Sequence, residues 1–135
     1  MNKALAAFVR QRAEGRCEYC RFVETFARFK FQVEHIVARQ HGGTDSIDNL
    51  ALACGFCNLH KGPNLSGIDP QTGTVVELFH PRCQVWSEHF KWDGPIIKGL
   101  SSHGRATVSV LLLNDPLQLA RRQVLLNEGV LALQS

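Results

Sequence analysis

The sequence lacks several features that would place the protein outside the ordinary globular class. Its apolar runs are all shorter than the roughly 20 residues that a membrane-spanning helix needs. Arg10 and Arg12 interrupt the first apolar segment, which is not typical of a secretory signal. No internal repeat and no low-complexity linker divides the chain. We therefore expect a single cytoplasmic domain over residues 1–135 that has no membrane partner.

The chain also lacks a strong excess of charge of one sign. It has 15 Lys and Arg residues against 12 Asp and Glu residues, which gives a formal net charge of +3. This mildly basic balance permits nucleic-acid binding but does not require it. Apolar residues make up 44% of the 135 positions, which is enough to form a hydrophobic core.

Hydrophobic patterning predicts an α+β fold. Helical spacing predicts a helix over 2–14 that Asn2 can cap, and Asp115-Pro116 predicts the start of a helix that runs to about Asn127. Short apolar or alternating runs predict strands over 29–37, 49–53, 75–79 and 104–113, of which 75–79 suits one arm of a hairpin. A short helix is expected from Asn58 until Gly62-Pro63 stops it.

Two Cys-x-x-Cys pairs give the strongest local signal. Cys17 and Cys20 form one pair, Cys54 and Cys57 form the other, and 33 residues lie between them. Two such turns can complete a tetrahedral thiolate site, which predicts a structural zinc because no coordination position stays open for chemistry. The alternatives are buried reduced thiols or a redox pair, although the βαβ context of a thioredoxin-like motif is absent. Cys83 lies outside both pairs and is assigned no role.

The segment between the cysteine pairs concentrates polar residues. Glu34 and His35 end a predicted strand, a Gly-Gly turn lets the chain return, and Asn49 starts the next strand. Asn58 directly follows the last zinc cysteine, so a bound zinc would hold its helix against the hairpin. We therefore expect Asn58 to lie close to Glu34 and His35.

These residue types suit the hydrolysis of a phosphodiester bond. That reaction needs a base for water, a cation for the phosphate charge, and groups that hold the backbone. A neutral His35 can serve as the base, and Lys61 can reach a phosphate. Glu34 and Asn58 offer the oxygen ligands that a hard cation such as Mg²⁺ prefers.

Taken together, the motifs resemble the HNH endonucleases, whose ββα-metal fold carries such a hairpin and helix. The resemblance rests on Glu34-His35, Gly42-Gly43-Thr44-Asp45, Asn49-Leu50, Cys54-x-x-Cys57, Asn58 and Lys61-Gly62, with Cys17-x-x-Cys20 upstream. It implies an HNH core over about 16–63 and a C-terminal extension over about 64–135. The implied fold is a hairpin and short helix stapled by the four-cysteine zinc, with flanking N- and C-terminal helices and extra short strands.

The resemblance also implies a role for each polar residue. His35 would be the general base, and Asn49 would hold it in position indirectly, through hydrogen bonds. Glu34 and Asn58 would bind a catalytic Mg²⁺ or Mn²⁺. Many members have Asp before the histidine, so the longer Glu34 could change the preferred ion, whereas Asn at the position of Asn58 is common. Candidate contacts to the nucleic acid are Lys61, Arg39 and His60.

The expected activity is divalent-metal-dependent hydrolysis of DNA, double-stranded in the first instance, leaving a 5′ phosphate and a 3′ hydroxyl. One active site per chain would cut one strand, so whether both strands are cut depends on whether two copies act together, for example as a homodimer. Two other hypotheses stay open. The protein could be a zinc-stapled nucleic-acid-binding module that has lost catalysis, or a zinc-ribbon scaffold that binds other proteins and has no affinity for DNA.

Overall fold

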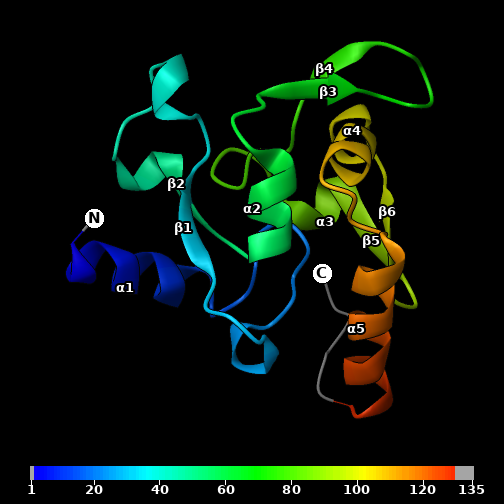
Figure 1. Ribbon diagram of the computed structural model, residues 1–135. Helices are drawn as coiled ribbons and strands as arrows, with labels where there is room; N and C mark the ends of the chain where they lie inside the picture. The colour runs from blue at the N-terminus through cyan, green and yellow to red at the C-terminus, as the bar shows by residue number, and fades with distance from the viewer. Residues whose placement is uncertain (1, 130–135) are drawn as a thin grey trace. The chain divides into compact units, whose positions relative to one another are not determined.

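The computed structural model describes residues 2–129, which form two compact units (Figure 1). The first unit comprises residues 2–65 together with 80–83, and the second comprises residues 66–79 and 84–129. Both units mix helices with short antiparallel hairpins, which confirms the predicted α+β class. None of the helices within residues 2–129 combines the length and apolar character that spanning a bilayer requires. The organisation of the chain as a single domain stays a prediction.

The first unit is built on one hairpin and two helices. Its elements are α1 (Lys3–Arg12), η1 (Glu24–Phe26), β1 (Gln32–His35), η2 (Arg39–His41), η3 (Ile47–Asn49), β2 (Leu50–Ala53) and α2 (Gly55–Lys61). β1 and β2 pair antiparallel, with Gln32 opposite Ala53 and His35 opposite Leu50. All four residues of β2 are buried, and α1 contacts both strands while α2 contacts β1. The hairpin therefore forms the centre of this unit.

Helix α1 forms where the sequence predicts it. Asn2 caps its first turn, because the Asn2 Oδ1 accepts a hydrogen bond of 2.7 Å from the Leu5 backbone N–H. At the other end, Arg12 donates to the carbonyl oxygens of Ile47 and Leu50 at 2.9 and 2.7 Å. These bonds fix α1 against the start of β2.

Helix α2 starts three residues earlier than predicted, at Gly55 rather than Asn58. Cys54 is its N-cap, and the Cys54 Sγ accepts from the Cys57 backbone N–H at 3.4 Å. The second cysteine pair is therefore the first turn of the helix, so Asn58 projects from the helix body.

The second unit contains two further hairpins and three helices. Its elements are β3 (Ser66–Ile68), β4 (Val75–Glu77), α3 (Trp86–His89), β5 (Phe90–Asp93), β6 (Ile96–Gly99), α4 (Ser102–Val110) and α5 (Pro116–Asn127). The hairpin suggested for 75–79 is present as β4 paired with β3, and the predicted helix from Pro116 to Asn127 is present with Asp115 as its cap. The β5–β6 hairpin has no counterpart in the sequence prediction.

The predicted strand over 104–113 is wrong, because residues 102–110 form helix α4. The Ser101 Oγ caps this helix by accepting from the Gly104 N–H at 3.0 Å. Packing then overrides the β-branched composition. A Cβ at Gly104 would lie 2.1 Å from the His89 carbonyl oxygen, so the glycine permits the close contact with the end of α3. Ala106 and Thr107 are fully buried on the inner face of the helix.

Candidate active site and metal centre

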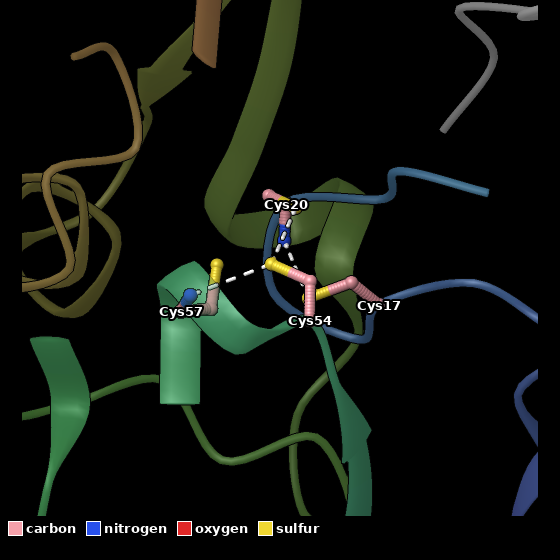
Figure 2. A group of neighbouring side chains, drawn as sticks. All are labelled: Cys17, Cys20, Cys54 and Cys57. Carbon is pink, nitrogen blue, oxygen red and sulfur yellow. Dashed lines mark hydrogen bonds between the residues drawn. The ribbon is translucent and has the colours of Figure 1, made fainter. Parts of the chain in front are cut away.

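The four paired cysteines converge in the first unit, as predicted. Figure 2 shows Cys17 and Cys20 on one turn facing Cys54 and Cys57 at the start of α2. All four are buried, and their Sγ atoms lie within 4.8 Å of one another. The pKa of Cys54 is lowered because the neighbouring thiols donate hydrogen bonds to its sulfur. A thiolate set of this kind suits zinc and leaves no open position, so the cluster is consistent with a structural zinc.

Glu18 and Tyr19 lie between Cys17 and Cys20, and they connect the four-cysteine cluster to the β1–β2 hairpin. The Tyr19 hydroxyl donates to the Glu34 Oε1, and burial raises the pKa of Tyr19 well above its usual value. The Glu18 Oε2 accepts from the Leu52 N–H at 2.8 Å, and the other Glu18 oxygen pairs with Arg82. The turn that would hold zinc therefore also holds the carboxylate of Glu34.

An open pocket of about 360 Å³ brings the predicted catalytic residues together. Glu34, His35 and Asn58 all line it, and so does Arg39 from η2. The remaining lining residues are Val33, Ala38, Gly62 and Pro63. A carboxylate, an imidazole and an amide thus meet at one hollow on the surface of the first unit.

His35 is held by an acidic residue that the sequence prediction assigned no role. The His35 Nε2 lies 2.7 Å from the Asp45 Oδ1, and Arg39 Nη2 donates to the same oxygen at 2.8 Å. These contacts lower the pKa of Asp45, with the His35 hydrogen bond as the largest cause. The Asp45 carboxylate at 2.7 Å is a much closer partner of Nε2 than the Arg39 Nε–H at 3.5 Å, so it favours the proton on Nε2 and leaves the lone pair of the neutral ring on Nδ1. Nδ1 has no hydrogen-bond partner within residues 2–129.

Glu34 lines the pocket and is only 6% exposed. Burial raises its pKa, while the nearby Lys61 and the Tyr19 hydrogen bond oppose this rise. The Lys61 Nζ lies 3.4 Å from the Glu34 Oε2 and donates a shorter bond of 2.9 Å to the Ile36 carbonyl oxygen. The 3.4 Å approach is loose for an ion pair, so the carboxylate keeps capacity for a further partner.

Asn58 presents its side chain from α2 toward β1. The Asn58 Nδ2 donates to the Gln32 Oε1, which leaves the Asn58 Oδ1 without a donor among the residues that the structure describes. An amide oxygen in this state can act as a ligand for a hard cation. Glu34 and Asn58 therefore form an oxygen donor set that fits Mg²⁺ or Mn²⁺, both of which bind few protein ligands and retain water.

Asn49 closes the loop between the two strands and does not line the pocket. Its Oδ1 accepts from the Val37 N–H at 2.9 Å, and its Nδ2 donates to the carbonyl oxygens of Val37 and Thr44 at 3.0 and 2.8 Å. Gly43 makes this possible, because a Cβ there would lie 1.7 Å from the Val37 carbonyl oxygen. The loop held in this way carries Asp45, the partner of His35.

The three candidate nucleic-acid contacts lie in different environments. Arg39 is on the pocket rim with 69% of its side chain exposed. His60 stacks on Phe56 with ring centroids 4.1 Å apart and is outside the pocket lining. Lys61 is only 2% exposed, so a phosphate contact would require its ammonium to leave both Glu34 and the Ile36 carbonyl.

Sequence reasoning missed three residues at the site, namely Tyr19, Gln32 and Asp45. Asp45 carried a usable signal, because it is the acidic residue of the Gly-Gly turn that follows His35. No sequence signal could have predicted the hydrogen bonds of Tyr19 and Gln32, because these bonds depend on how the cysteine turn and α2 pack on β1.

Comparison with known families gives one match in the first unit. Residues 17–64 match the family model described as HNH endonuclease. No match was found among curated proteins or among solved structures. The matched segment contains the buried four-cysteine cluster, so residues 17–64 are similar to an HNH endonuclease domain, as the motifs predicted. The match suggests a nuclease and implies a nucleic-acid substrate.

Proposed function

We propose that the protein is a divalent-metal-dependent endonuclease that hydrolyses phosphodiester bonds in double-stranded DNA, with one metal ion and a histidine base. The observation that carries this proposal is that Glu34, His35 and Asn58 line one pocket, and that the His35 ring is hydrogen-bonded to the Asp45 carboxylate. A general base oriented by a carboxylate next to oxygen ligands is the arrangement that this reaction requires.

His35 is the base in this proposal. The Nδ1 of the neutral ring removes a proton from water, and the resulting hydroxide attacks phosphorus. The imidazolium that forms keeps its Nε2–H bond to Asp45, whose negative charge stabilises it. Arg39 shares the same Asp45 oxygen from the pocket rim, where its guanidinium can also meet a DNA phosphate.

Glu34 and Asn58 would hold the divalent ion through the Glu34 carboxylate and the Asn58 Oδ1. Such an ion, when bound, neutralises charge on the phosphate and on the departing 3′ oxygen. Tyr19 fixes one Glu34 oxygen, and Gln32 turns the Asn58 amide so that its oxygen is available. Lys61 would balance the buried negative charge of Glu34 until a divalent ion binds.

The contact between Lys61 and Glu34 also favours a second candidate function, a nucleic-acid-binding module without catalysis. If Lys61 stays on Glu34, the carboxylate is already neutralised and the oxygen donor set for a metal is incomplete. This candidate predicts binding of DNA without cleavage under any divalent metal.

A plasmid-nicking assay separates the two candidates. Purified protein of measured zinc content is incubated at low salt with supercoiled plasmid and Mg²⁺, Mn²⁺ or EDTA. His35→Ala is compared with His41→Ala, a matched control in which an exposed histidine of η2 is removed. We expect nicking by the wild type and by His41→Ala, and its loss with EDTA and in His35→Ala. A wild type that binds plasmid but leaves it supercoiled with both metals would establish the binding module instead.

A further inference from the structure

A short stretch before β1, residues 26–30, exposes aromatic and cationic side chains side by side. Phe26 is 52% exposed and Phe29 is 74% exposed. The Arg28 guanidinium carbon lies 5.5 Å from the centroid of the Phe29 ring, and Lys30 follows on the surface. Exposing two phenylalanine side chains within four residues forgoes burial that would stabilise the fold, which points to an interaction surface.

The two cations of this stretch are not neutralised by the protein. Arg28 and Lys30 form no ion pair and no hydrogen bond with any residue in the described part of the chain. The acidic residue that precedes them, Glu24, is already engaged by Arg10 at 3.4 Å and by the Phe31 N–H at 2.8 Å. The stretch therefore presents two free positive charges on either side of a flat apolar ring.

We propose that residues 26–30 are a DNA contact, in which Arg28 and Lys30 bind backbone phosphates and Phe29 stacks against a base. The proposal rests on the proposed function for the class of substrate. Free cations recognise phosphates by releasing condensed counterions, and an aromatic ring beside them can stack on a base or wedge into a base step. An acidic or apolar protein partner would satisfy only one of these two features.

The position of the stretch fits a strand of DNA that also reaches the pocket. It leads directly into β1, whose far end carries Glu34 and His35. His35 is six positions after Phe29, so the two lie at most about 20 Å apart along the chain. That distance corresponds to roughly six base pairs of a duplex. Phe29 would then contact the substrate a few nucleotides from the bond that is cut.

The chain supplies a matched control in Phe8 of the same unit. Phe8 is 44% exposed and also lies beside a guanidinium, with the Arg12 carbon 5.3 Å from its ring centroid. Arg12, however, is committed to the carbonyl oxygens of Ile47 and Leu50. Phe8 therefore has the same kind of ring and neighbour without a cation that is free to bind phosphate.

Fluorescence anisotropy with a labelled duplex of about 30 base pairs, without added Mg²⁺ or Mn²⁺, tests the proposal. We expect Phe29→Ala to weaken binding about tenfold, Phe29→Trp to restore it, and Phe8→Ala to leave it unchanged. In Arg28→Ala/Lys30→Ala, the slope of log affinity against log salt should fall by about two. Equal affinities for Phe29→Ala and Phe8→Ala, or an unchanged salt slope in the double variant, would overturn the proposal.

The same variants in the nicking assay separate this proposal from the proposed function. If the wild type nicks plasmid and Phe29→Ala binds as tightly as the wild type, only the contact surface is wrong. If the wild type binds DNA in a Phe29-dependent manner but never nicks, the contact stands and the nuclease function fails. If the wild type does not bind DNA at low salt, both proposals fail.

Discussion

The 2.7 Å contact between His35 and Asp45 assigns different tasks to the two ring nitrogens of the proposed base. A carboxylate can only accept, so it holds the proton on Nε2 and leaves Nδ1 basic. Asp45 is itself exposed, yet Asn49 and Gly43 fix the loop that carries it. The loop that carries Asp45, rather than a buried charge, therefore orients the His35 ring.

Replacing Asp45 with Asn tests this assignment. The amide can donate to Nε2 and so stabilise the other tautomer, which places the proton on Nδ1. We expect nicking to slow by about 10- to 100-fold while affinity for DNA stays the same. Asp48→Asn, which changes another exposed aspartate of the same loop, should behave as wild type. The tautomer argument fails if single-turnover rates of the two variants agree.

At the scale of elements, the two cysteine turns join the N-terminal segment to the first turn of α2. The second turn starts the helix that carries Asn58, and the first turn carries the Tyr19 that bonds to Glu34. Zinc would therefore hold both proposed ligands of the catalytic ion at once without touching either of them.

Removing one cysteine should show this coupling. We expect Cys57→Ser to lose the one zinc ion per chain and to lower the unfolding temperature by roughly 10 °C or more, because metal binding contributes directly to folding. Zinc content by mass spectrometry and a thermal melt check this. Cys83→Ser is the control, since Cys83 is exposed and outside the cluster. Retention of zinc by Cys57→Ser would contradict the four-cysteine site.

In the second unit, we expect His89 at the end of α3 to make the stability of the protein depend on pH. Burial and the neighbouring His103 lower the pKa of His89, whose Nδ1 lies 2.6 Å from the Ser101 Oγ. The unfolded chain then binds the proton more readily, so stability is full above pH 6.5 and is lost as pH falls through the lowered pKa. Tryptophan fluorescence reports on unfolding of this unit. Between pH 7.5 and 5, the midpoint of unfolding should fall less in His89→Asn than in the wild type. An equal fall in both would contradict this account.

Sequence patterns anticipated the elements whose signals are local. The Asn2 cap, the cysteine spacing and the Asp115-Pro116 helix start each act within one turn of chain, and each appears in the structure. Helix α4 was predicted as a strand because its β-branched residues resemble a strand, whereas its close packing through Gly104 depends on a distant segment. The pairing of Glu34 with Lys61 likewise arises only when α2 packs on β1.

At the scale of the whole molecule, the chain leaves the first unit after residue 65 and contributes residues 80–83 to it again. Within that returning segment, Arg82 pairs with Glu18 in the first cysteine turn and donates to the Leu50 carbonyl oxygen at 3.3 Å. Burial lowers the pKa of Arg82 to about 10. The first unit is therefore completed by residues that lie beyond the segment 17–64 that matches the family model.

Arg82→Ala should destabilise the protein by about 3 kcal/mol or more, because it leaves the Glu18 carboxylate buried without its cation. Urea unfolding measures this loss. Lys98→Ala removes an exposed ion pair with Asp93 and should cost less than about 1 kcal/mol. Equal midpoints for the two variants would show that residues 80–83 do not complete the first unit.

Chemical rescue of the His35→Ala variant by added imidazole tests the central claim most directly. If His35 supplies the base, free imidazole should restore part of the nicking activity in His35→Ala, with a rate that rises as the neutral form of imidazole becomes more abundant. It should restore nothing in Glu34→Gln, which retains the base but weakens the proposed ligand set. Absence of rescue in a His35→Ala protein that keeps its zinc and its DNA affinity, or equal rescue in both variants, would contradict a base at His35.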